Sequence, residues 1–200
     1  MMARWICAAL TGAFLAAFLI AGGSHHTRAE EVKTAIFAGG CFWCVEDVFD
    51  GVPGVTETVS GYAGGTKPKP TYGAHAGYRE AVRVRYDPSK VSYEELVNVF
   101  WRNIDPFDAV GQFCDQGDAY RSVLYVGNDE EKRIAEATKQ AVAKKFKRPV
   151  ATEIEKVTTF GAAEDYHQNY HNTNTVSYKF YKWNCGRAQR LKEIWGSPPA

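Results

Sequence analysis

The stretch Thr34–Phe49, TAIFAGGCFWCVEDVF, defines the first unit of the fold. It opens on an apolar run that predicts a buried strand, and the two glycines after Ala38 predict a tight turn. Apolar side chains then recur at helical spacing, so we predict a helix that begins near Phe42. Cys41 therefore lies at the junction between a strand and the first turn of a helix.

Periodicity and turn signals predict the elements that follow. Residues 80–86 alternate between apolar and polar positions, which is typical of a half-buried strand. Ser92 and Glu95 have the spacing of a capping box, which predicts the start of a second helix. The other expected elements are strands at 55–59, 122–126 and 152–157, a helix at 129–146 with Asn128 as its N-cap, and loops at 61–77 and 105–117.

The predicted order is β-α-β-β-α-β, followed by a helix, a strand and a tail from Tyr178 to Trp195. This order is typical of the split β-α-β arrangement of ferredoxin-like folds, in which helices cover a sheet. We therefore predict an α+β fold with a ferredoxin-like split β-α-β core, a mixed sheet with helices packed on it, and an irregular C-terminal tail.

The composition is that of one globular domain. The 200 residues include 24 Lys and Arg, 23 Asp and Glu, 45% hydrophobic and 14% aromatic residues, and five cysteines. A formal net charge of +1 lacks the basic excess that nucleic-acid binding requires, so we expect no nucleic-acid partner. Residues 30–200 have the length of a single domain, for which we expect a monomer.

Residues 1–29 have the pattern of a cleaved signal peptide. Arg4 precedes a long uncharged run, and Ala29 ends a pattern of small residues that suits a cleavage site. We therefore expect an exported protein, periplasmic or secreted. An uncleaved membrane anchor is the alternative, because the uncharged run is long enough to span a bilayer. Cleavage would remove Cys7 and leave four cysteines.

Cys41 is a candidate nucleophile. A thiol at the start of a helix faces unpaired backbone N–H groups and the positive end of the helix dipole, both of which favour the thiolate. The paired glycines before Cys41 let the backbone turn sharply and leave the thiol accessible. The local sequence therefore predicts a reactive cysteine.

Cys41-x-x-Cys44 also has other interpretations. Half of a zinc site could pair with His167-x-x-x-His171, although the two halves are much farther apart in sequence than in compact zinc modules. A haem attachment site would need histidine where Val45 stands, so that interpretation fails. A stable disulfide, or the redox pair of a general thiol-disulfide oxidoreductase, is the serious alternative.

Gly40-Cys41-Phe42-Trp43 resembles the signature of the A-type peptide methionine sulfoxide reductases. The resemblance extends over nearly the whole chain after the leader, from about Lys33 to Gly196, and such co-occurrence is far more specific than Cys-x-x-Cys alone. The segments that resemble the family in order and spacing are Ser60–Gly65, Pro70–Tyr72, Glu80–Val82, Tyr86–Pro88, Phe100–Trp101, Asp105–Pro106, Tyr120–Ser122 and Glu164–Gln168.

The resemblance implies thiol-dependent reduction of methionine S-sulfoxide, peptide-bound or free, to methionine. In that chemistry the Cys41 thiolate attacks the sulfoxide sulfur and becomes a sulfenic acid, with no cofactor and no metal. The oxygen must gain protons as its bond to sulfur breaks, so an acid and hydrogen-bond donors are expected around it. By resemblance, Glu80 is that acid and Tyr72 and Tyr120 are the donors.

The resemblance also assigns the residues that surround the substrate. Phe42 and Trp43 are expected to form an apolar box for the S-methyl group, and a tight chiral box accepts one sulfoxide epimer. Asp115 matches a position that orients the site. Tyr62 and His167 are expected to bind around the substrate, shaping the pocket or bracing the C-terminal segment.

Turnover requires a resolving thiol that condenses with the Cys41 sulfenic acid, and the resemblance implies a thioredoxin-like donor that reduces the resulting disulfide. Many relatives carry glycine at the position of Cys44, so the resolving thiol is open in this chain. Cys44 lies one helical turn from Cys41, whereas Cys185 lies in a tail that we expect to be mobile. We rank these two equally and place Cys114 behind them, because it also fits a small buried apolar residue.

Overall fold

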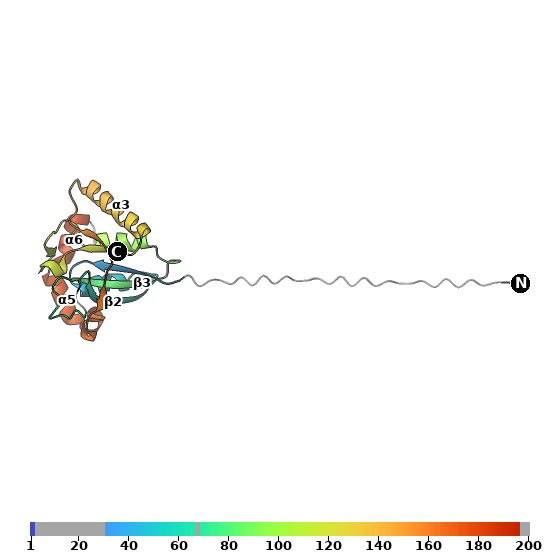
Figure 1. The fold of residues 1–200 in the computed structure, drawn as a ribbon, viewed down its shortest axis with the longest axis horizontal. Helices are drawn as coiled ribbons and strands as arrows, with labels where there is room; N and C mark the ends of the chain where they lie inside the picture. Colours follow the sequence, from blue (N-terminus) through green and yellow to red (C-terminus); the bar gives the residue numbers. More distant parts are fainter. Residues whose placement is uncertain (3–30, 67–68, 197–200) are drawn as a thin grey trace.

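The computed structural model describes residues 1–2, 31–66 and 69–196, so the predicted signal peptide lies almost wholly outside the described residues. One six-stranded sheet forms its centre, in the order β7-β6-β1-β3-β2-β8, and helices pack around this sheet (Figure 1). The strands are β1 (Lys33–Ala38), β2 (Val55–Ala63), β3 (Arg79–Tyr86), β6 (Val123–Val126), β7 (Glu153–Lys156) and β8 (Phe160–Ala162).

The four central strands form the predicted ferredoxin-like core. β1 pairs antiparallel with both β3 and β6, and β2 pairs antiparallel with β3. This arrangement places the two strands that flank each helix apart in the sheet, as the split β-α-β pattern requires. β7 then adds parallel to β6, and β8 adds antiparallel to β2. The predicted α+β class and mixed sheet are confirmed.

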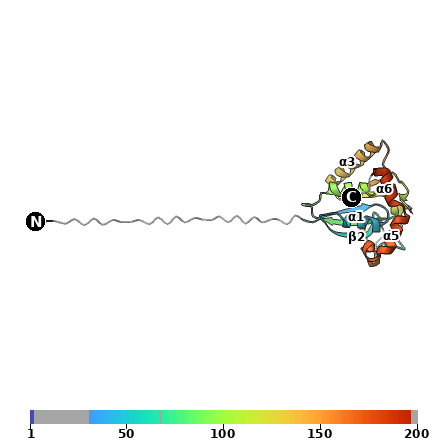
Figure 2. The same ribbon diagram turned by 180° about the vertical axis from the view of Figure 1, so that it is seen from behind.

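The first three helices follow their sequence signals. Helix α1 (Phe42–Asp50) begins at the expected residue. Helix α2 (Tyr93–Arg102) has the complete capping box of Ser92 and Glu95. Helix α3 (Asp129–Phe146) is capped by the side chain of Asn128 and lies along the top of the molecule in Figures 1 and 2. None of the helices in the described part of the chain is long and apolar enough to cross a membrane.

Aromatic rings fill the space between the sheet and the helices α1 and α2. Phe37 of β1 stacks on Phe49 of α1 and on Phe100 of α2, with ring centroids 4.6 Å and 5.6 Å apart. All three side chains are buried. Such contacts fix the end of β1 against the start of α1, and this junction carries Cys41.

Two predicted loops contain regular structure. β2 continues to Ala63, into the expected loop at 61–77, because it pairs with β3 on one side and β8 on the other. A Cβ atom on Gly61 would overlap the carbonyl oxygen of Gly161, so glycine is needed where these strands approach. The expected loop at 105–117 contains a hairpin of β4 (Gly111–Gln112) and β5 (Asp115–Gln116), followed by a 3₁₀ turn, η1 (Asp118–Tyr120).

The C-terminal segment is helical, so the prediction of an irregular, mobile tail is wrong. A second 3₁₀ turn, η2 (Asp165–His167), leads into α4 (Tyr170–Thr173), α5 (Thr175–Asn184) and α6 (Arg187–Trp195). Gly186 separates α5 from α6 with a φ of 65°, a left-handed conformation that favours glycine. Both helices lie on the same side of the molecule in Figures 1 and 2.

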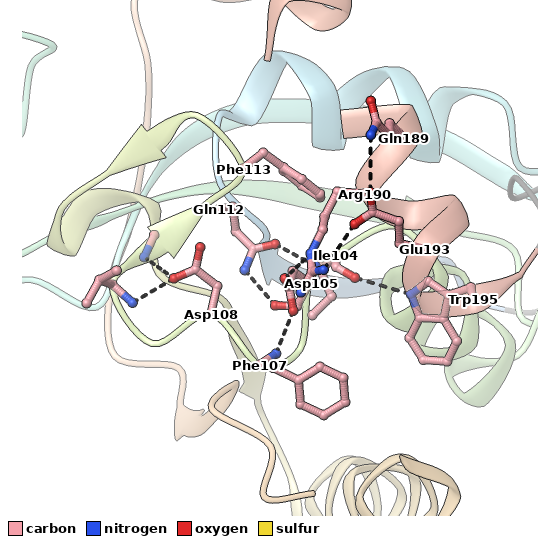
Figure 3. Close-up of polar contacts among 12 residues, drawn as sticks. Ile104, Asp105, Phe107, Asp108, Gln112, Phe113, Gln189, Arg190, Glu193 and Trp195 are labelled. Atoms are coloured by element: carbon pink, nitrogen blue, oxygen red, sulfur yellow. Dashed lines mark hydrogen bonds and ion pairs between the residues drawn. The ribbon is translucent and has the colours of Figure 1, made fainter. Parts of the chain in front are cut away.

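Polar contacts attach α6 to the segment that follows α2 (Figure 3). Nε of Arg190 donates to Oδ2 of Asp105 at 2.8 Å, and the Trp195 indole donates to the carbonyl oxygen of Ile104 at 3.3 Å. The side-chain amide of Gln112 bonds to both the backbone N–H and the carbonyl of Asp105, at 2.8 Å each. Long-range contacts of this kind leave no local signal in the sequence, which is why the tail was predicted as irregular.

Candidate active site

A small cavity of about 70 Å³ lies beside Cys41. It brings together side chains from five separate segments of the chain, and all of them except Tyr181 are residues that the sequence marks as candidates. A cleft of about 450 Å³ between α2 and α3 is larger, but no cysteine or histidine lines it. The small cavity is lined by Cys41, Phe42, Trp43, Tyr72, Glu80, Asp115, Tyr120 and Tyr181.

The backbone before α1 holds Cys41 in place. Cys41 is the N-cap of α1, and its carbonyl accepts hydrogen bonds from the backbone N–H groups of Cys44 and Val45 at 3.1 and 3.4 Å. Gly40 has a φ of 86°, and a Cβ atom there would overlap the Gln112 side chain. Glycine is therefore required before Cys41 for both its conformation and its close packing.

Glu80 lies almost completely buried, at 2% exposure. Its Oε2 accepts a hydrogen bond from the backbone N–H of Phe42 at 3.0 Å. Burial raises the pKa of Glu80 to about 8, because the Phe42 N–H and the Tyr120 hydroxyl only partly offset the loss of solvation. Glu80 is therefore mainly protonated at neutral pH and can give up a proton inside the cavity.

The hydroxyl group of Tyr120 lies within hydrogen-bonding reach of both Glu80 and Tyr72. Burial, followed by the nearby charge of Glu80, raises the pKa of both tyrosines, so both hydroxyls stay protonated and can donate. Tyr72 is 45% exposed and lies at the rim, where its backbone N–H donates to Oε1 of Glu164 at 2.9 Å. The two tyrosines thus present O–H donors on the side of the cavity that holds Glu80.

Tyr181 of α5 is a cavity residue that the sequence did not reveal. Its hydroxyl donates to Oδ2 of Asp115 at 2.5 Å and lies beside the Cys41 sulfur. Burial raises the pKa of Asp115, and the Tyr181 hydroxyl partly opposes that shift. Asp115 therefore orients Tyr181 toward Cys41. Because the tail was predicted as irregular, none of its aromatic residues could be placed at the site.

Cys44 is the more acidic thiol of the buried pair. Its pKa is lowered to about 6, first by a hydrogen bond from the Cys41 thiol and then, against the cost of burial, by the positive charge of Arg187. The Tyr178 hydroxyl and the charge of Lys182 also lower the pKa of Cys44. Arg187, Tyr178 and Lys182 come from α5 and α6, so the C-terminal helices add to the effect of Cys41 in lowering the pKa of Cys44.

Cys41 itself has a raised pKa, so the expectation that the helix terminus makes it the thiolate is wrong for the resting site. Burial is the main cause, followed by the hydrogen bond and charge of Cys44 and by the charge of Glu80. The backbone N–H of Phe42, the donor expected to favour a Cys41 thiolate, is instead bonded to Glu80. Burial therefore opposes ionisation of Cys41, whereas the groups around Cys44 favour its thiolate.

Tyr62 and His167 contact residues of the cavity wall but do not line the cavity itself, so their part in substrate binding stays a prediction, while their contacts show how they brace the wall. The Trp43 indole N–H donates to Nδ1 of His167 at 3.1 Å, and burial lowers the pKa of His167, which keeps the accepting nitrogen unprotonated. The Tyr62 hydroxyl donates to Oε2 of Glu164 at 3.0 Å. Tyr170 stacks on Trp43 with centroids 3.8 Å apart. These contacts hold the aromatic wall rigid.

Cys114 and Cys185 form a disulfide bond, with their Cα atoms 4.9 Å apart. Cys114 is exposed, so its interpretation as a small buried residue is wrong. Cys185 follows the last residue of α5 and does not lie in a mobile tail. Cys41 and Cys44 are free thiols, and both are buried.

The histidines of the zinc interpretation have other partners. His167 accepts the Trp43 indole N–H, and Nε2 of His171 lies 3.3 Å from Oδ2 of Asp50. Over residues 31–66 and 69–196, the one group of side chains with ligand atoms close enough for a metal is Cys114, Asp115 and Cys185, where the two sulfurs are already joined. The geometry therefore gives no support to a zinc site built on Cys41 and Cys44.

Comparisons with known proteins point to one family. The family described as peptide methionine sulfoxide reductase matches residues 33–198. Peptide methionine sulfoxide reductase MsrA 2 of Rhizobium meliloti (strain 1021) is 48% identical over 171 residues, which cover 84% of this chain and 86% of that protein. MsrA of Bacillus subtilis (strain 168) is 44% identical and covers 84% of this chain and 98% of its own length.

Solved structures agree with the sequence comparisons. Methionine sulfoxide reductase A of Corynebacterium diphtheriae superimposes with a TM-score of 0.65 at 31% identity, covering 72% of this chain and 76% of that one. Mxr1 of Saccharomyces cerevisiae in its reduced form gives a TM-score of 0.66 at 29% identity, and the match covers 72% of this chain and 87% of that chain. With the cavity at Cys41, these matches show that the chain belongs to the peptide methionine sulfoxide reductase family.

Proposed function

We propose that this chain reduces the S epimer of methionine sulfoxide to methionine at the cavity beside Cys41. The observation that carries the proposal is the convergence of a nucleophile, a protonated acid and two hydroxyl donors on one small cavity. The cavity takes the end of a methionine sulfoxide side chain but no backbone. Free and peptide-bound residues can therefore both present their sulfoxide.

Cys44 accepts the proton of Cys41 as the Cys41 sulfur attacks the sulfoxide sulfur. The bond between sulfur and oxygen breaks, and Glu80 gives its proton to the oxygen, which is transferred to Cys41 as a sulfenic acid. Methionine sulfur gains two electrons and Cys41 loses two. Tyr72 and Tyr120 donate hydrogen bonds to the oxygen while negative charge develops on it.

The shape of the cavity accounts for the choice of one epimer. Phe42 and Trp43 form an apolar wall, while Glu80 and the tyrosine hydroxyls stand on a polar side. A sulfoxide that directs its methyl group to the wall and its oxygen to the donors presents its sulfur to Cys41 in one handedness only. Contacts with His167 and Tyr170 hold Trp43 in place, so the apolar wall does not move to make room for the other epimer.

Cys44 then resolves the sulfenic acid. It lies in the first turn of α1 beside the Cys41 sulfur, and because its pKa is low it readily gives up the proton that it took from Cys41, which leaves with the sulfenic hydroxyl group. Condensation forms a Cys41–Cys44 disulfide and releases the oxygen as water. A thioredoxin-like dithiol donor must return two electrons before the next turnover. We expect the chain to act as a monomer.

The direct test supplies S- and R-sulfoxide peptides with dithiothreitol and measures the methionine formed. We expect turnover of the S epimer alone and loss of activity in Cys41→Ser. Absence of S-epimer turnover would contradict the proposal. Rapid reduction of insulin that depends on Cys44 would instead support a general thiol-disulfide oxidoreductase, although the burial of both thiols opposes that function.

We also propose export, with cleavage after Ala29 and action in the periplasm or outside the cell. The support is the uncharged run and cleavage pattern of residues 1–29. Expression of the full chain in a bacterial host, followed by fractionation and N-terminal sequencing, tests this. A periplasmic protein that begins at Glu30 is expected, and an intact chain held in the membrane fraction would show an uncleaved anchor.

A further inference from the structure

Three metal-ligating groups meet where the β4–β5 hairpin contacts the end of α5. The sulfurs of Cys114 and Cys185 and a carboxylate oxygen of Asp115 all lie within 4.8 Å of one another. Cys114 and Asp115 belong to the hairpin, and Cys185 is the C-cap of α5. Thiolate sulfur and carboxylate oxygen are both ordinary ligands of Zn²⁺. In the disulfide form the two sulfurs are bonded to each other, so a metal can bind both of them only in the dithiol form.

The hairpin itself sets the spacing between Cys114 and Asp115. Gln112 pairs with Asp115 across the two strands, and Phe113 and Cys114 form the loop between them. The Cys114 sulfur lies 3.8 Å from Oδ1 of Asp115. A tetrahedral Zn²⁺ with bonds of about 2.3 Å to sulfur and about 2.1 Å to oxygen holds those two atoms about 3.6 Å apart. The observed distance therefore suits two ligands of one ion.

Contacts that do not involve the sulfurs hold Cys185 close to the hairpin. The hairpin and α6 are both attached to Asp105, through the Gln112 side-chain amide and through Nε of Arg190, each at 2.8 Å (Figure 3). The Cα atoms of Cys114 and Cys185 are 4.9 Å apart. After reduction the two side chains therefore stay adjacent, and rotation about their Cα–Cβ bonds can separate the sulfurs to the ~3.8 Å that two thiolates of a tetrahedral ion require.

The carboxylate of Asp115 offers one oxygen to a metal. Its Oδ2 accepts the hydroxyl of Tyr181 at 2.5 Å, whereas its Oδ1 faces the Cys114 sulfur. A metal on Oδ1 therefore does not need to displace Tyr181. Asp115 also lines the cavity beside Cys41, so the cluster adjoins the candidate active site without using its nucleophile.

A buried cation balances the charge of the cluster. Arg187 is 3% exposed, and its guanidinium lies over the ring of Phe113 at 4.4 Å to the centroid. Its positive charge also acts on Asp115. Two thiolates and one carboxylate around a divalent ion leave one net negative charge, which Arg187 offsets. The same positive charge favours loss of the thiol protons that metal binding releases.

The cluster is open to solvent on the side of the hairpin loop. Cys114 is exposed, whereas Asp115 and Cys185 are half-buried. A metal can therefore enter without opening the fold, and a water molecule can take the fourth position of a tetrahedral ion. Three protein ligands and one water are the coordination of an open zinc site.

We propose that Cys114, Cys185 and Asp115 bind one divalent cation that accepts thiolate ligands, such as Zn²⁺, when the two cysteines are reduced. Binding releases the two thiol protons, and no electron is transferred. The disulfide form does not bind the ion, because each sulfur is bonded to the other. The redox state of the surface pair thus decides whether the chain carries a metal. This site is independent of the proposed reductase function.

Zinc binding by a chain that keeps only the surface cysteines tests the proposal. The chain of residues 30–200 with Cys41→Ser/Cys44→Ser is reduced with a phosphine, the phosphine is removed in the absence of oxygen, and Zn²⁺ is titrated in competition with a coloured chelator. We expect about one Zn²⁺ per reduced chain, with release of about two protons, and none in the disulfide form. Co²⁺ in place of Zn²⁺ is expected to give thiolate-to-metal charge-transfer absorption and the visible bands of tetrahedral coordination.

Three further substitutions in that chain identify the ligands. Cys185→Ser is expected to weaken Zn²⁺ binding by more than about 100-fold, because one thiolate is lost. Asp115→Asn, which keeps an acceptor for Tyr181, is expected to weaken it by about 10–100-fold. Asp118→Asn is the matched control and should bind Zn²⁺ as its parent does, since the Asp118 side chain is 73% exposed and pairs with Arg121. Circular dichroism verifies that each variant is folded.

Several results would overturn the proposal. These are a reduced chain that binds no Zn²⁺, a surface disulfide that the phosphine leaves intact in the folded chain, and binding that is equally tight in the disulfide form or in Cys185→Ser. Unchanged affinity in Asp115→Asn would overturn the assignment of Asp115 as a ligand. None of these measurements involves methionine sulfoxide, so failure of the metal site leaves the proposed function standing, and failure of the proposed function leaves the metal site standing.

Discussion

The backbone N–H of Phe42 donates a hydrogen bond to Oε2 of Glu80 at 3.0 Å. This contact joins the start of α1 to the start of β3 and places the acid beside the nucleophile. The N-terminus of α1 therefore binds the carboxyl group of Glu80, while burial opposes ionisation of Cys41 and the groups around Cys44 favour its thiolate. In the proposed mechanism Glu80 gives a proton to the sulfoxide oxygen, Cys41 attacks the sulfoxide sulfur, and Cys44 accepts the proton of Cys41.

Replacement of Glu80 by glutamine is expected to lower kcat by about 10²–10⁴-fold, because the amide keeps an acceptor for Phe42 but cannot protonate the sulfoxide oxygen. The pKa of Glu80 is raised to about 8, so the acid form is lost as the pH rises through that value. In the unmodified chain kcat should fall above pH 8, and in Glu80→Gln that fall should disappear. An equal high-pH decline in both chains would rule out Glu80 as the proton donor.

Tyr120→Phe is expected to lower kcat by about 10²–10³-fold with little change in KM, because its hydroxyl donates to charge that develops only as the bond to oxygen breaks. Tyr166→Phe is the matched control, since Tyr166 is 61% exposed and does not line the cavity. Steady-state kinetics with an S-sulfoxide peptide measures kcat and KM for both variants. A rise in KM at constant kcat would show that Tyr120 only binds the substrate.

The pKa of Cys44 is lowered to about 6, so a thiolate should appear as the pH rises through that value. The ultraviolet absorbance of the thiolate, recorded while Cys114 and Cys185 stay joined, reports this titration. We expect the transition to vanish in Cys44→Ser and to persist in Cys41→Ser, whose hydroxyl can still donate to Cys44. If the transition is lost in Cys41→Ser but kept in Cys44→Ser, the thiolate belongs to Cys41.

Glu46 is fully buried on α1, where one carboxylate oxygen accepts from the backbone N–H of Asn169 at 3.0 Å. Burial raises the pKa of Glu46 to about 7 from an ordinary value of 4.5. The unfolded chain ionises this group first, so the folded state loses stability as the pH rises from 4.5 to 7. The cost above pH 7 is about 3 kcal/mol.

Glu46→Gln removes that cost and is expected to stabilise the chain above pH 7 but not below pH 4.5. Glu136→Gln, at an exposed position of α3, is the control and should change stability by less than about 0.5 kcal/mol. Urea unfolding above pH 7 and below pH 4.5 measures the free energy of unfolding of both variants. Equal effects of Glu46→Gln at high and low pH would show that ionisation of Glu46 is not their cause.

The sequence predicts the core because local signals and packing agree there. Apolar alternation at 80–86, the capping box at Ser92 and the apolar run before Gly39 all specify elements that the sheet then uses. The side chains of Cys41, Glu80 and Tyr120 come to one cavity because the strand order places the end of β1 beside the starts of both β3 and β6.

The C-terminal half of the site could not be predicted in this way. Tyr181 reaches Asp115 across 66 residues, and Cys185 reaches Cys114 across 71. Both contacts depend on where α5 and α6 pack, and the anchor of α6 is the bond between Arg190 and Asp105. The sequence did not reveal the low pKa of Cys44 for a related reason, since Arg187, Tyr178 and Lys182, which add to the hydrogen bond from Cys41, belong to these helices.

Transfer of the sulfoxide oxygen to Cys41 is the central claim, and one isotope measurement tests it most directly. The Cys44→Ser/Cys185→Ser chain, which lacks the resolving thiol Cys44 and the other leading candidate from the sequence, is mixed with an S-sulfoxide peptide whose oxygen is the heavy isotope. The Cys41 peptide is examined by mass spectrometry within one turnover. The account predicts a sulfenic acid on Cys41 that carries the heavy oxygen, with about one methionine formed per chain. Methionine formation with no labelled oxygen on Cys41, or with the label on another residue, would contradict it.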